Sequence, residues 1–188
     1  MRPIEPALNF PPELLLQAQG VKVAFLDVDG VLTDGGLCFS EQGETLKRFS
    51  TLDGHGLKLL KHAGITPVII TGRDSAPLRV RLKALGIEHA RFGTEDKLPA
   101  AEDYLKSLGL GWHQAAAMGD DWPDLPVMQR AAFACAPQNA HAQALALAHY
   151  VTARKGGDGA ARELCDLLVV ASGHYAQLLS RVGSASAA

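Results

Sequence analysis

The stretch DVDGVLTD at residues 27–34 decides the fold, and it directly follows the mostly apolar run VKVAFL at residues 21–26. The β-branched and aromatic residues of this run predict a strand inside a sheet. Gly30 allows the chain to turn, so the carboxylates of Asp27 and Asp29 can both face one crevice beyond the strand end. Such a pair suits a magnesium-assisted phosphoryl-transfer site better than it suits a hydrophobic core.

Asp-x-Asp-Gly sequences also occur in calcium-binding loops and in ordinary turns. An EF-hand loop needs further oxygen ligands and a closing Glu between two helices, whereas this motif follows a predicted strand. An ordinary turn explains Gly30 or Asp34, but it does not explain two acidic side chains beside a hydrophobic strand end, where unpaired charge is costly. We therefore favour a functional site.

The length of 188 residues fits one domain, and the net charge of −2 gives no reason to expect a nucleic-acid partner. Cys38, Cys135 and Cys165 are widely spaced and contain no Cys-x-x-Cys pair, so we expect free thiols and no zinc site. Residues 1–19 are too short and too rich in proline for a signal sequence or a membrane span, and no other segment is apolar enough. These features predict a cytoplasmic protein without a membrane partner.

Strand-like and helix-like segments alternate along the chain. This alternation predicts an α/β fold, a Rossmann-like three-layer parallel sheet with helices on both faces, at residues 21–172. Residues 1–20 form an N-terminal extension with a short helix at 13–17, and residues 173–188 form a tail whose small residues would be mobile without a partner. The expected strands are residues 21–28, 65–70, 90–92, 115–118 and 132–136, and the expected helices are residues 56–62, 76–85, 97–108, 125–130, 140–148 and 161–171.

A β-hairpin is predicted directly after the aspartate motif. Residues 37–40 and 45–50 have strand character and are joined by Glu41-Gln42-Gly43-Glu44. This position places the hairpin over the mouth of the crevice, where loops often carry function, so we favour a functional role over a passive surface flap.

Three further strand ends contribute to the same site. Thr71-Gly72-Arg73 offers a hydroxyl and backbone amides, which could hold phosphate oxygens or could simply cap the next helix. Lys97 lies at a predicted helix start, where a cation gains nothing from the helix dipole and is better explained by an anion that it meets. Gly119-Asp120-Asp121-Trp122-Pro123-Asp124 is a second acidic cluster, which would repel the first unless a divalent cation lay between them.

In this order, the four motifs resemble those of the haloacid dehalogenase-like phosphohydrolases, from residue 21 to about residue 170. The resemblance implies that Asp27 is the nucleophile, that Asp29 is the general acid and base, and that Thr71 and Lys97 hold the phosphoryl group. It also implies an Mg²⁺ site made by Asp27, Asp120 and the backbone carbonyl of Asp29. Asp121 and Asp124 would orient these groups without binding the metal.

The spacing of the motifs leaves no room for a cap domain. Between Asp27 and Thr71 only the hairpin and one helix fit, and between Thr71 and Lys97 only one helix and a short strand fit. A capless member of this superfamily either acts on a macromolecule or has its site covered by neighbouring subunits.

A narrower resemblance favours cover by neighbouring subunits. The strings DVDGVLTDGGL, TGRDSAPLRVRLKALGI and GDDWPDLPVM, together with GGDGAARE at residues 156–163, resemble the 3-deoxy-D-manno-octulosonate 8-phosphate phosphatases. This resemblance implies a sugar acid phosphate as substrate, a role in lipopolysaccharide biosynthesis, and a homotetramer with intersubunit active sites. It also implies a set of substrate-binding residues, which are Asp29, Ser50, Thr51, Leu52, Asp53, Gly54, Lys58, Arg73, Arg81 and Lys97.

Several alternatives remain open at this point. Phosphatases of nine-carbon sialic-acid-type 9-phosphates share most of the pattern, a broad sugar phosphatase is also compatible, and a non-catalytic oligomerisation or regulatory domain is a third option. Lys58 stands where the family more often has Arg, and a lysine offers a point charge in place of a bidentate fork. For the glycine-rich residues 156–160 we expect a contact between subunits.

Overall fold

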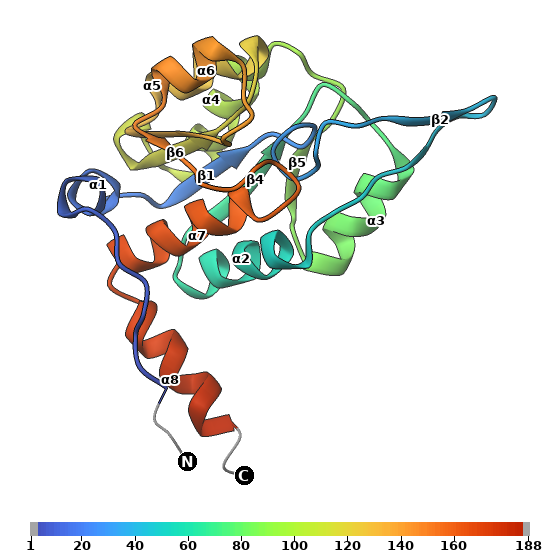
Figure 1. The fold of residues 1–188 in the computed structure, drawn as a ribbon. Helices are drawn as coiled ribbons and strands as arrows, with labels where there is room; N and C mark the ends of the chain where they lie inside the picture. The colour runs from blue at the N-terminus through green and yellow to red at the C-terminus, as the bar shows by residue number, and fades with distance from the viewer. Residues whose placement is uncertain (1–3, 186–188) are drawn as a thin grey trace.

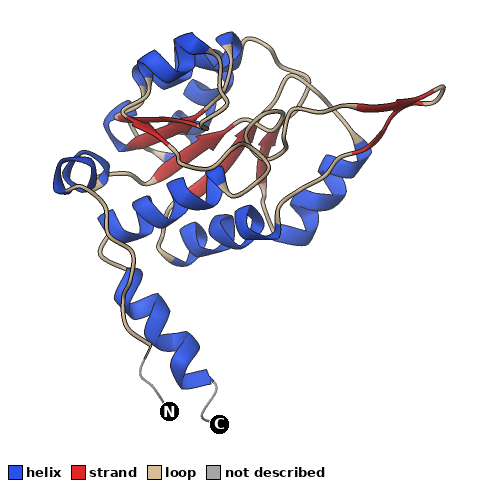
Figure 2. Cartoon of the chain, viewed as in Figure 1, coloured by secondary structure: helices blue, strands red, loops and turns tan. Residues whose placement is uncertain are grey.

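The computed structural model describes residues 4–185, and its centre is a six-stranded parallel sheet (Figures 1 and 2). The strands lie in the order β5-β4-β1-β6-β7-β8, and all of their pairings are parallel. Their bounds are β1 Val23–Leu26, β4 Thr66–Ile70, β5 His89–Arg91, β6 Ala115–Met118, β7 Phe133–Ala136 and β8 Tyr150–Val151.

Two apolar cores, one on each face of the sheet, make the three layers. Ala24 and Leu26 of β1 pack in one core with helices α2 (Thr51–His62), α3 (Ala76–Leu85) and α7 (Ala160–Ala171). Val23 and Phe25 of the same strand pack in the other core with α4 (Lys97–Leu108), α5 (Leu125–Arg130) and α6 (Ala142–Leu147). This arrangement confirms the fold class predicted from the sequence. A strand that is covered on both faces must be apolar throughout, as β1 is.

The predicted hairpin is present as β2 (Cys38–Ser40) and β3 (Gly43–Leu46). It extends away from the domain (Figure 1), and none of its residues 38–46 lines the cleft that lies beyond the end of β1. The predicted second strand ran to residue 50, but β3 ends at Leu46 and α2 begins at Thr51. Ser50 is the N-cap of α2 and accepts a hydrogen bond from the backbone N–H of Leu52 at 3.2 Å.

The predicted start of this helix at Gly56 was therefore five residues late. Gly54 and Gly56 lower the helix propensity of the segment, but both glycines are buried in helix contacts. A Cβ atom on Gly54 would lie 2.3 Å from the Arg81 guanidinium on α3, and one on Gly56 would lie 3.0 Å from Cys165 on α7. Tertiary packing thus overrides local propensity here.

The two ends of the chain run together away from the sheet (Figure 1). The N-terminal helix α1 (Pro12–Ala18) is close to its predicted place and packs mainly on α7. Part of the predicted tail is a helix, α8 (Tyr175–Ala185), and the Tyr175 hydroxyl accepts hydrogen bonds from the backbone N–H groups of Ala7 and Leu8. The last three residues of the predicted tail lie outside the described part of the chain. Within the described part, no helix is long and apolar enough to cross a membrane.

Candidate active site

The carboxyl ends of three neighbouring strands border one cleft with a volume of about 430 Å³. Asp27 and Asp29 follow β1, Thr71 follows β4, and Asp120 follows β6. Lys97 reaches the cleft from the first residue of α4. The residues that line the cleft are Asp27, Asp29, Thr71, Gly72, Arg73, Glu95, Lys97, Asp120, Asp121, Pro123 and Asp124.

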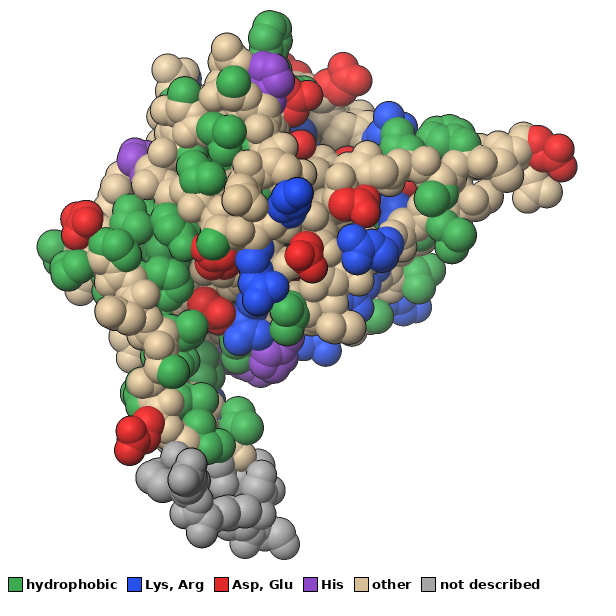
Figure 3. All heavy atoms as spheres, in the orientation of Figure 1, with side chains coloured by type: hydrophobic (Ala, Val, Ile, Leu, Met, Phe, Trp, Pro, Cys, Tyr) green, Lys and Arg blue, Asp and Glu red, His purple; other side chains and the backbone are tan. Residues whose placement is uncertain are grey.

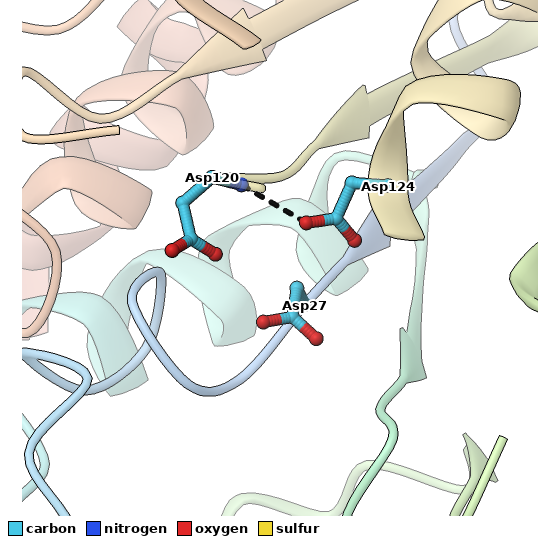
Figure 4. A group of neighbouring side chains, drawn as sticks. All are labelled: Asp27, Asp120 and Asp124. Carbon is cyan, nitrogen blue, oxygen red and sulfur yellow. Dashed lines mark hydrogen bonds between the residues drawn. The ribbon is translucent and has the colours of Figure 1, made fainter. Parts of the chain in front are cut away.

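Three carboxylates converge at one side of this cleft, those of Asp27, Asp120 and Asp124 (Figure 4). Each offers an oxygen that lies within 4.8 Å of the oxygens offered by the other two. Gly30 makes this approach possible, because a Cβ atom at that position would lie only 2.0 Å from Oδ2 of Asp120. The backbone of Gly30 also has a φ of 101°, which few residues other than glycine adopt.

Lys97 is buried between two of these carboxylates. Its Nζ donates hydrogen bonds to Oδ1 of Asp27 and, at 2.6 Å, to Oδ1 of Asp124. The other oxygen of Asp124 accepts hydrogen bonds from the backbone N–H groups of Asp120 at 3.0 Å and Asp121 at 3.3 Å. Asp124 therefore connects Lys97 to the loop that carries Asp120, which fits an orienting role better than a ligand role.

The acidic cluster carries more negative charge than Lys97 can balance. Burial, together with the neighbouring Asp124 charge, raises the pKa of Asp27 to about 6 despite the opposing effect of Lys97. Burial and the charges of Asp27 and Asp124 raise the pKa of Asp120 to about 7. Closely spaced carboxylate oxygens are the hard ligands that Mg²⁺ prefers, and its charge would relieve the repulsion that helps to raise these pKa values, so the residues present fit that ion.

Asp29 lies between two cations. Nζ of Lys47 donates a hydrogen bond to Oδ1 of Asp29, and Nε of Arg73 lies 3.8 Å from Oδ2. Lys47 follows β3 in the hairpin stem and also pairs with Oε1 of Glu44 at 2.7 Å. Although burial alone would lower the pKa of Lys47, its pairing with the carboxylates of Asp29 and Glu44 raises that pKa, so Lys47 stays charged.

The contact between Lys47 and Asp29 was not predicted from the sequence. Residue 47 lay inside a predicted exposed strand, where a lysine is an ordinary surface residue. No local pattern distinguishes it, because its partner Asp29 lies 18 residues away.

Thr71 is buried, and its hydroxyl accepts a hydrogen bond from the backbone N–H of Arg73 at 3.3 Å. The next helix, α3, has Ser75 as its N-cap residue. Thr71 is therefore not a cap of that helix, which removes the alternative explanation for its presence.

Most of the expected substrate-binding residues on α2 and α3 do not line the cleft of their own chain. The expected loop at residues 50–54 is instead the N-cap and first turn of α2. Arg81 donates a hydrogen bond to the backbone carbonyl of Ser50 at 3.1 Å, and Lys58 is exposed on α2. Residues expected at the substrate but absent from the cleft lining are Ser50, Thr51, Leu52, Asp53, Gly54, Lys58 and Arg81.

Asp53 has a structural partner of its own. Its buried carboxylate accepts hydrogen bonds from the backbone N–H groups of Gly159, at 3.3 Å, and Arg162, at 2.8 Å. These groups belong to the start of α7, so Asp53 satisfies orphan donors at that helix end. The side chain thereby ties α2 to α7.

The glycines at residues 156–160 make a close contact within the chain, and the expected contact between subunits stays a prediction. A Cβ atom on Gly156 would lie 1.7 Å from the backbone oxygen of Gly30. The backbone N–H of Gly157 donates to the carbonyl of Val31 at 3.0 Å. The glycines allow this loop to pack directly under the turn of the aspartate motif.

Comparisons with known proteins agree with this arrangement. A sequence profile of haloacid dehalogenase-like hydrolases matches residues 92–164. The chain is 42% identical over 159 residues to the 3-deoxy-D-manno-octulosonate 8-phosphate phosphatase of Yersinia pestis, which covers 85% of each chain. It is 40% identical over 162 residues to the phosphatase of the same name from Salmonella typhimurium, which covers 86% of each chain.

A solved structure gives the same result. The 3-deoxy-D-manno-octulosonate 8-phosphate phosphatase of Moraxella catarrhalis, crystallised in complex with a magnesium ion, a phosphate ion and a KDO molecule, matches with a TM-score of 0.87 and 39% identity. The match covers 90% of this chain and 98% of the other chain. The cleft geometry, the sheet order and this similarity over most of the sequence agree, and the chain belongs to the 3-deoxy-D-manno-octulosonate 8-phosphate phosphatase family of haloacid dehalogenase-like hydrolases.

Proposed function

We propose that the protein is a Mg²⁺-dependent phosphatase that hydrolyses 3-deoxy-D-manno-octulosonate 8-phosphate to the free sugar acid and phosphate, for lipopolysaccharide biosynthesis. The observation that carries the proposal is the convergence of Asp27, Asp120 and Lys97 in one cleft beside Asp29. Family membership supplies the substrate, because the chain matches phosphatases that are named for this substrate over most of their length.

Each residue of the cluster has a place in this reaction. A carboxylate oxygen of Asp27 attacks the phosphorus and forms an aspartyl-phosphate as the bond from phosphorus to the sugar oxygen breaks. Asp29 gives its proton to the leaving sugar oxygen and then accepts a proton from the water that hydrolyses the intermediate. Thr71 and Lys97 hold the oxygens of the phosphoryl group.

Asp27, Asp120 and the backbone carbonyl of Asp29 would hold Mg²⁺. The bound ion supplies positive charge that lets an anionic nucleophile approach a phosphate dianion. Lys97 adds charge on the same side, and Asp124 keeps Lys97 in place.

The test of the mechanism is Asp27→Asn, with Asp103→Asn on the exposed face of α4 as the matched control. Removing the nucleophile should lower phosphate release from the eight-carbon substrate by about three orders of magnitude or more. The control should keep wild-type turnover, because Asp103 is 70% exposed and pairs only with the surface residue Arg91 among the described residues. Undiminished turnover by Asp27→Asn would rule out the proposed chemistry.

The substrate assignment is tested by comparing kcat/KM on the eight-carbon 8-phosphate with kcat/KM on a sialic-acid-type 9-phosphate. Arg73 lines the cleft with a side chain that is 47% exposed, so its guanidinium is available to a sugar carboxylate. A higher kcat/KM on the nine-carbon substrate would reassign the enzyme to the rival class.

We further propose a homotetramer in which a neighbouring subunit closes each cleft. The hairpin presents exposed apolar side chains (Figure 3), with Phe39 62% exposed and Leu46 66% exposed. Such side chains on a projecting segment favour contact with another chain. The residues on α2 and α3 that lie away from their own cleft, among them Lys58, would then serve the cleft of a neighbour.

A cytoplasmic location is also part of the proposal. Cys38, Cys135 and Cys165 are all free thiols in the structure, and Cys38 is exposed on the hairpin. Free exposed thiols fit a reducing compartment.

A further inference from the structure

Lys47 is a partly buried residue with a covered side chain, and no motif of the family pattern described above includes it. Its side chain is 0% exposed, although it lies in the connection between β3 and α2. Its ammonium group contacts Oδ1 of Asp29 and Oε1 of Glu44. Burying an ammonium group is costly unless it is paired with negative charge. The carboxylates of Asp29 and Glu44 together offset that cost and keep the Lys47 side chain in place.

The lysine holds one particular oxygen of Asp29. Oδ1 accepts the hydrogen bond from Lys47 and a longer one, at 3.4 Å, from the hydroxyl of Thr33. Among residues 4–185, no group donates a hydrogen bond to Oδ2, and the nearest cation, Nε of Arg73, lies 3.8 Å away. The single hydroxyl proton of Thr33 also has the closer carbonyl of Val28, at 3.3 Å, as an acceptor, so Lys47 is the main donor to Oδ1. The contact with Lys47 leaves Oδ2 as the oxygen free to carry the proton.

Lys47 is not placed to contact the substrate. It is absent from the lining of the cleft and fully covered, whereas Arg73 lines the cleft with a half-exposed side chain. Within its own chain, Lys47 reaches the reacting groups through its contact with Asp29.

We propose that Lys47, anchored by Glu44, is a positioning residue that fixes the Asp29 carboxyl group so that Oδ2 faces the leaving oxygen. The inference rests on the proposed function, in which Asp29 protonates that oxygen. In this step the bond from phosphorus to the sugar oxygen breaks, the bond from phosphorus to Asp27 forms, and the proton on Asp29 passes to the departing oxygen.

The proposal distinguishes leaving groups. A sugar alkoxide needs a proton as it departs, and so does phenolate to a lesser extent, whereas p-nitrophenolate is stable enough to leave without one. A misplaced acid therefore slows phosphoryl transfer most for the sugar phosphate, less for phenyl phosphate and least for p-nitrophenyl phosphate. The quantity to compare is kcat/KM, because it reports the steps up to departure of the leaving group.

The experiment compares wild type with Lys47→Met, Lys47→Arg and the control Lys83→Met, whose lysine is exposed on α3. Lys47→Met should lower kcat/KM by about 100-fold on the eight-carbon sugar phosphate, within the range that general acid catalysis contributes, but by less than about 3-fold on p-nitrophenyl phosphate. Phenyl phosphate should fall between them. Lys47→Arg, which keeps a cationic donor, should recover part of the loss, and Lys83→Met should match wild type.

Affinity for the free sugar acid separates positioning from direct binding. The inhibition constant of 3-deoxy-D-manno-octulosonate should be the same in wild type and Lys47→Met, because Lys47 does not contact the sugar. A weakened constant together with equal losses on the two aryl phosphates would show direct binding and overturn the proposal. Equal losses on all three substrates, or no loss on any, would overturn it too.

Two measurements keep the test independent of folding and of the proposed function. If Lys47→Met does not fold, Glu44→Gln removes the anchoring charge while keeping the lysine, and it should show a smaller loss in the same order of substrates. Inactivity of the wild type on the eight-carbon substrate would refute the proposed function. A wild type that is active while both variants lose activity equally on all substrates would refute only the role of Lys47.

Discussion

At the scale of single residues, the sequence was most informative at the four motifs, whose order along the chain matches that of a known superfamily. Asp27 and Asp29 lie at the end of a predicted strand, Thr71 and Asp120 follow predicted strands, and Lys97 opens a predicted helix. All five border the same cleft. The sequence could not reveal Lys47 or the contact between Asp53 and α7, because both depend on partners that only the folded chain brings close.

The raised pKa values of Asp27 and Asp120 predict that Mg²⁺ affinity depends on pH. In the metal-free protein these pKa values are about 6 and about 7, so protons occupy the carboxylates as the pH falls through this range. Mg²⁺ must then displace those protons, which weakens its apparent affinity. Isothermal titration calorimetry should show tighter binding at about pH 8 than at about pH 6, with proton release near pH 6–7. Equal affinity at both pH values without proton release would contradict the prediction.

Substitution of Asp53 should lower the stability of the fold and leave the catalytic groups of its own chain intact. Asp53→Ala leaves the buried N–H groups of Gly159 and Arg162 without their acceptor, at a cost of about 1–3 kcal/mol in the free energy of unfolding. Denaturant titration measures this cost. The exposed control Asp103→Ala should change the free energy by less than about 0.5 kcal/mol, and a similarly small change for Asp53→Ala would disprove the contact.

At the scale of elements, the long periodic segments were predictable and the junctions were not. Helices α3 and α4 have the predicted bounds, because their apolar spacing is regular and αL glycines, Gly86 and Gly109, end them. The two-residue strand β8 is too short to show any period, and the start of α2 was obscured by its glycines. In both cases the deciding contacts come from other elements.

The loop before α7 gives an element-scale prediction. Gly156→Ala would place a methyl group 1.7 Å from the backbone oxygen of Gly30, and neither backbone can move without disturbing the Asp27 turn. The variant should lose about 3 kcal/mol or more of stability, at the upper end of overpacking costs, and turnover should fall with it. In Gly20→Ala the nearest heavy atom lies 3.8 Å away, so thermal unfolding should be almost unchanged. Equal unfolding temperatures for the two variants would contradict this account.

At the scale of the whole molecule, the missing cap leaves the cleft open on its own chain. The short spacing between the motifs predicted this openness. In the structure, the hairpin extends away from the domain (Figure 1), and none of its residues 38–46 lines the cleft. A single chain thus holds the acidic cluster and Lys97, but it does not bring Lys58 or the first turn of α2 to that cleft. In the proposed tetramer, the two sets meet between chains.

The double substitution Phe39→Asp and Leu46→Asp should therefore separate the subunits and split the two activities. Both side chains are more than half exposed on the hairpin, and charges there oppose burial against another chain. Sedimentation velocity should show a smaller species, and kcat/KM on the eight-carbon sugar phosphate should fall by about 10-fold or more through the loss of charged contacts supplied by a neighbour. Turnover of p-nitrophenyl phosphate should persist, because Asp27, Lys97 and Asp120 lie within one chain. Leu16→Asp, at an equally exposed position on α1 away from the hairpin, is the control and should keep the wild-type assembly. A monomeric double variant with full activity on the sugar phosphate would show that each cleft is complete without a neighbour.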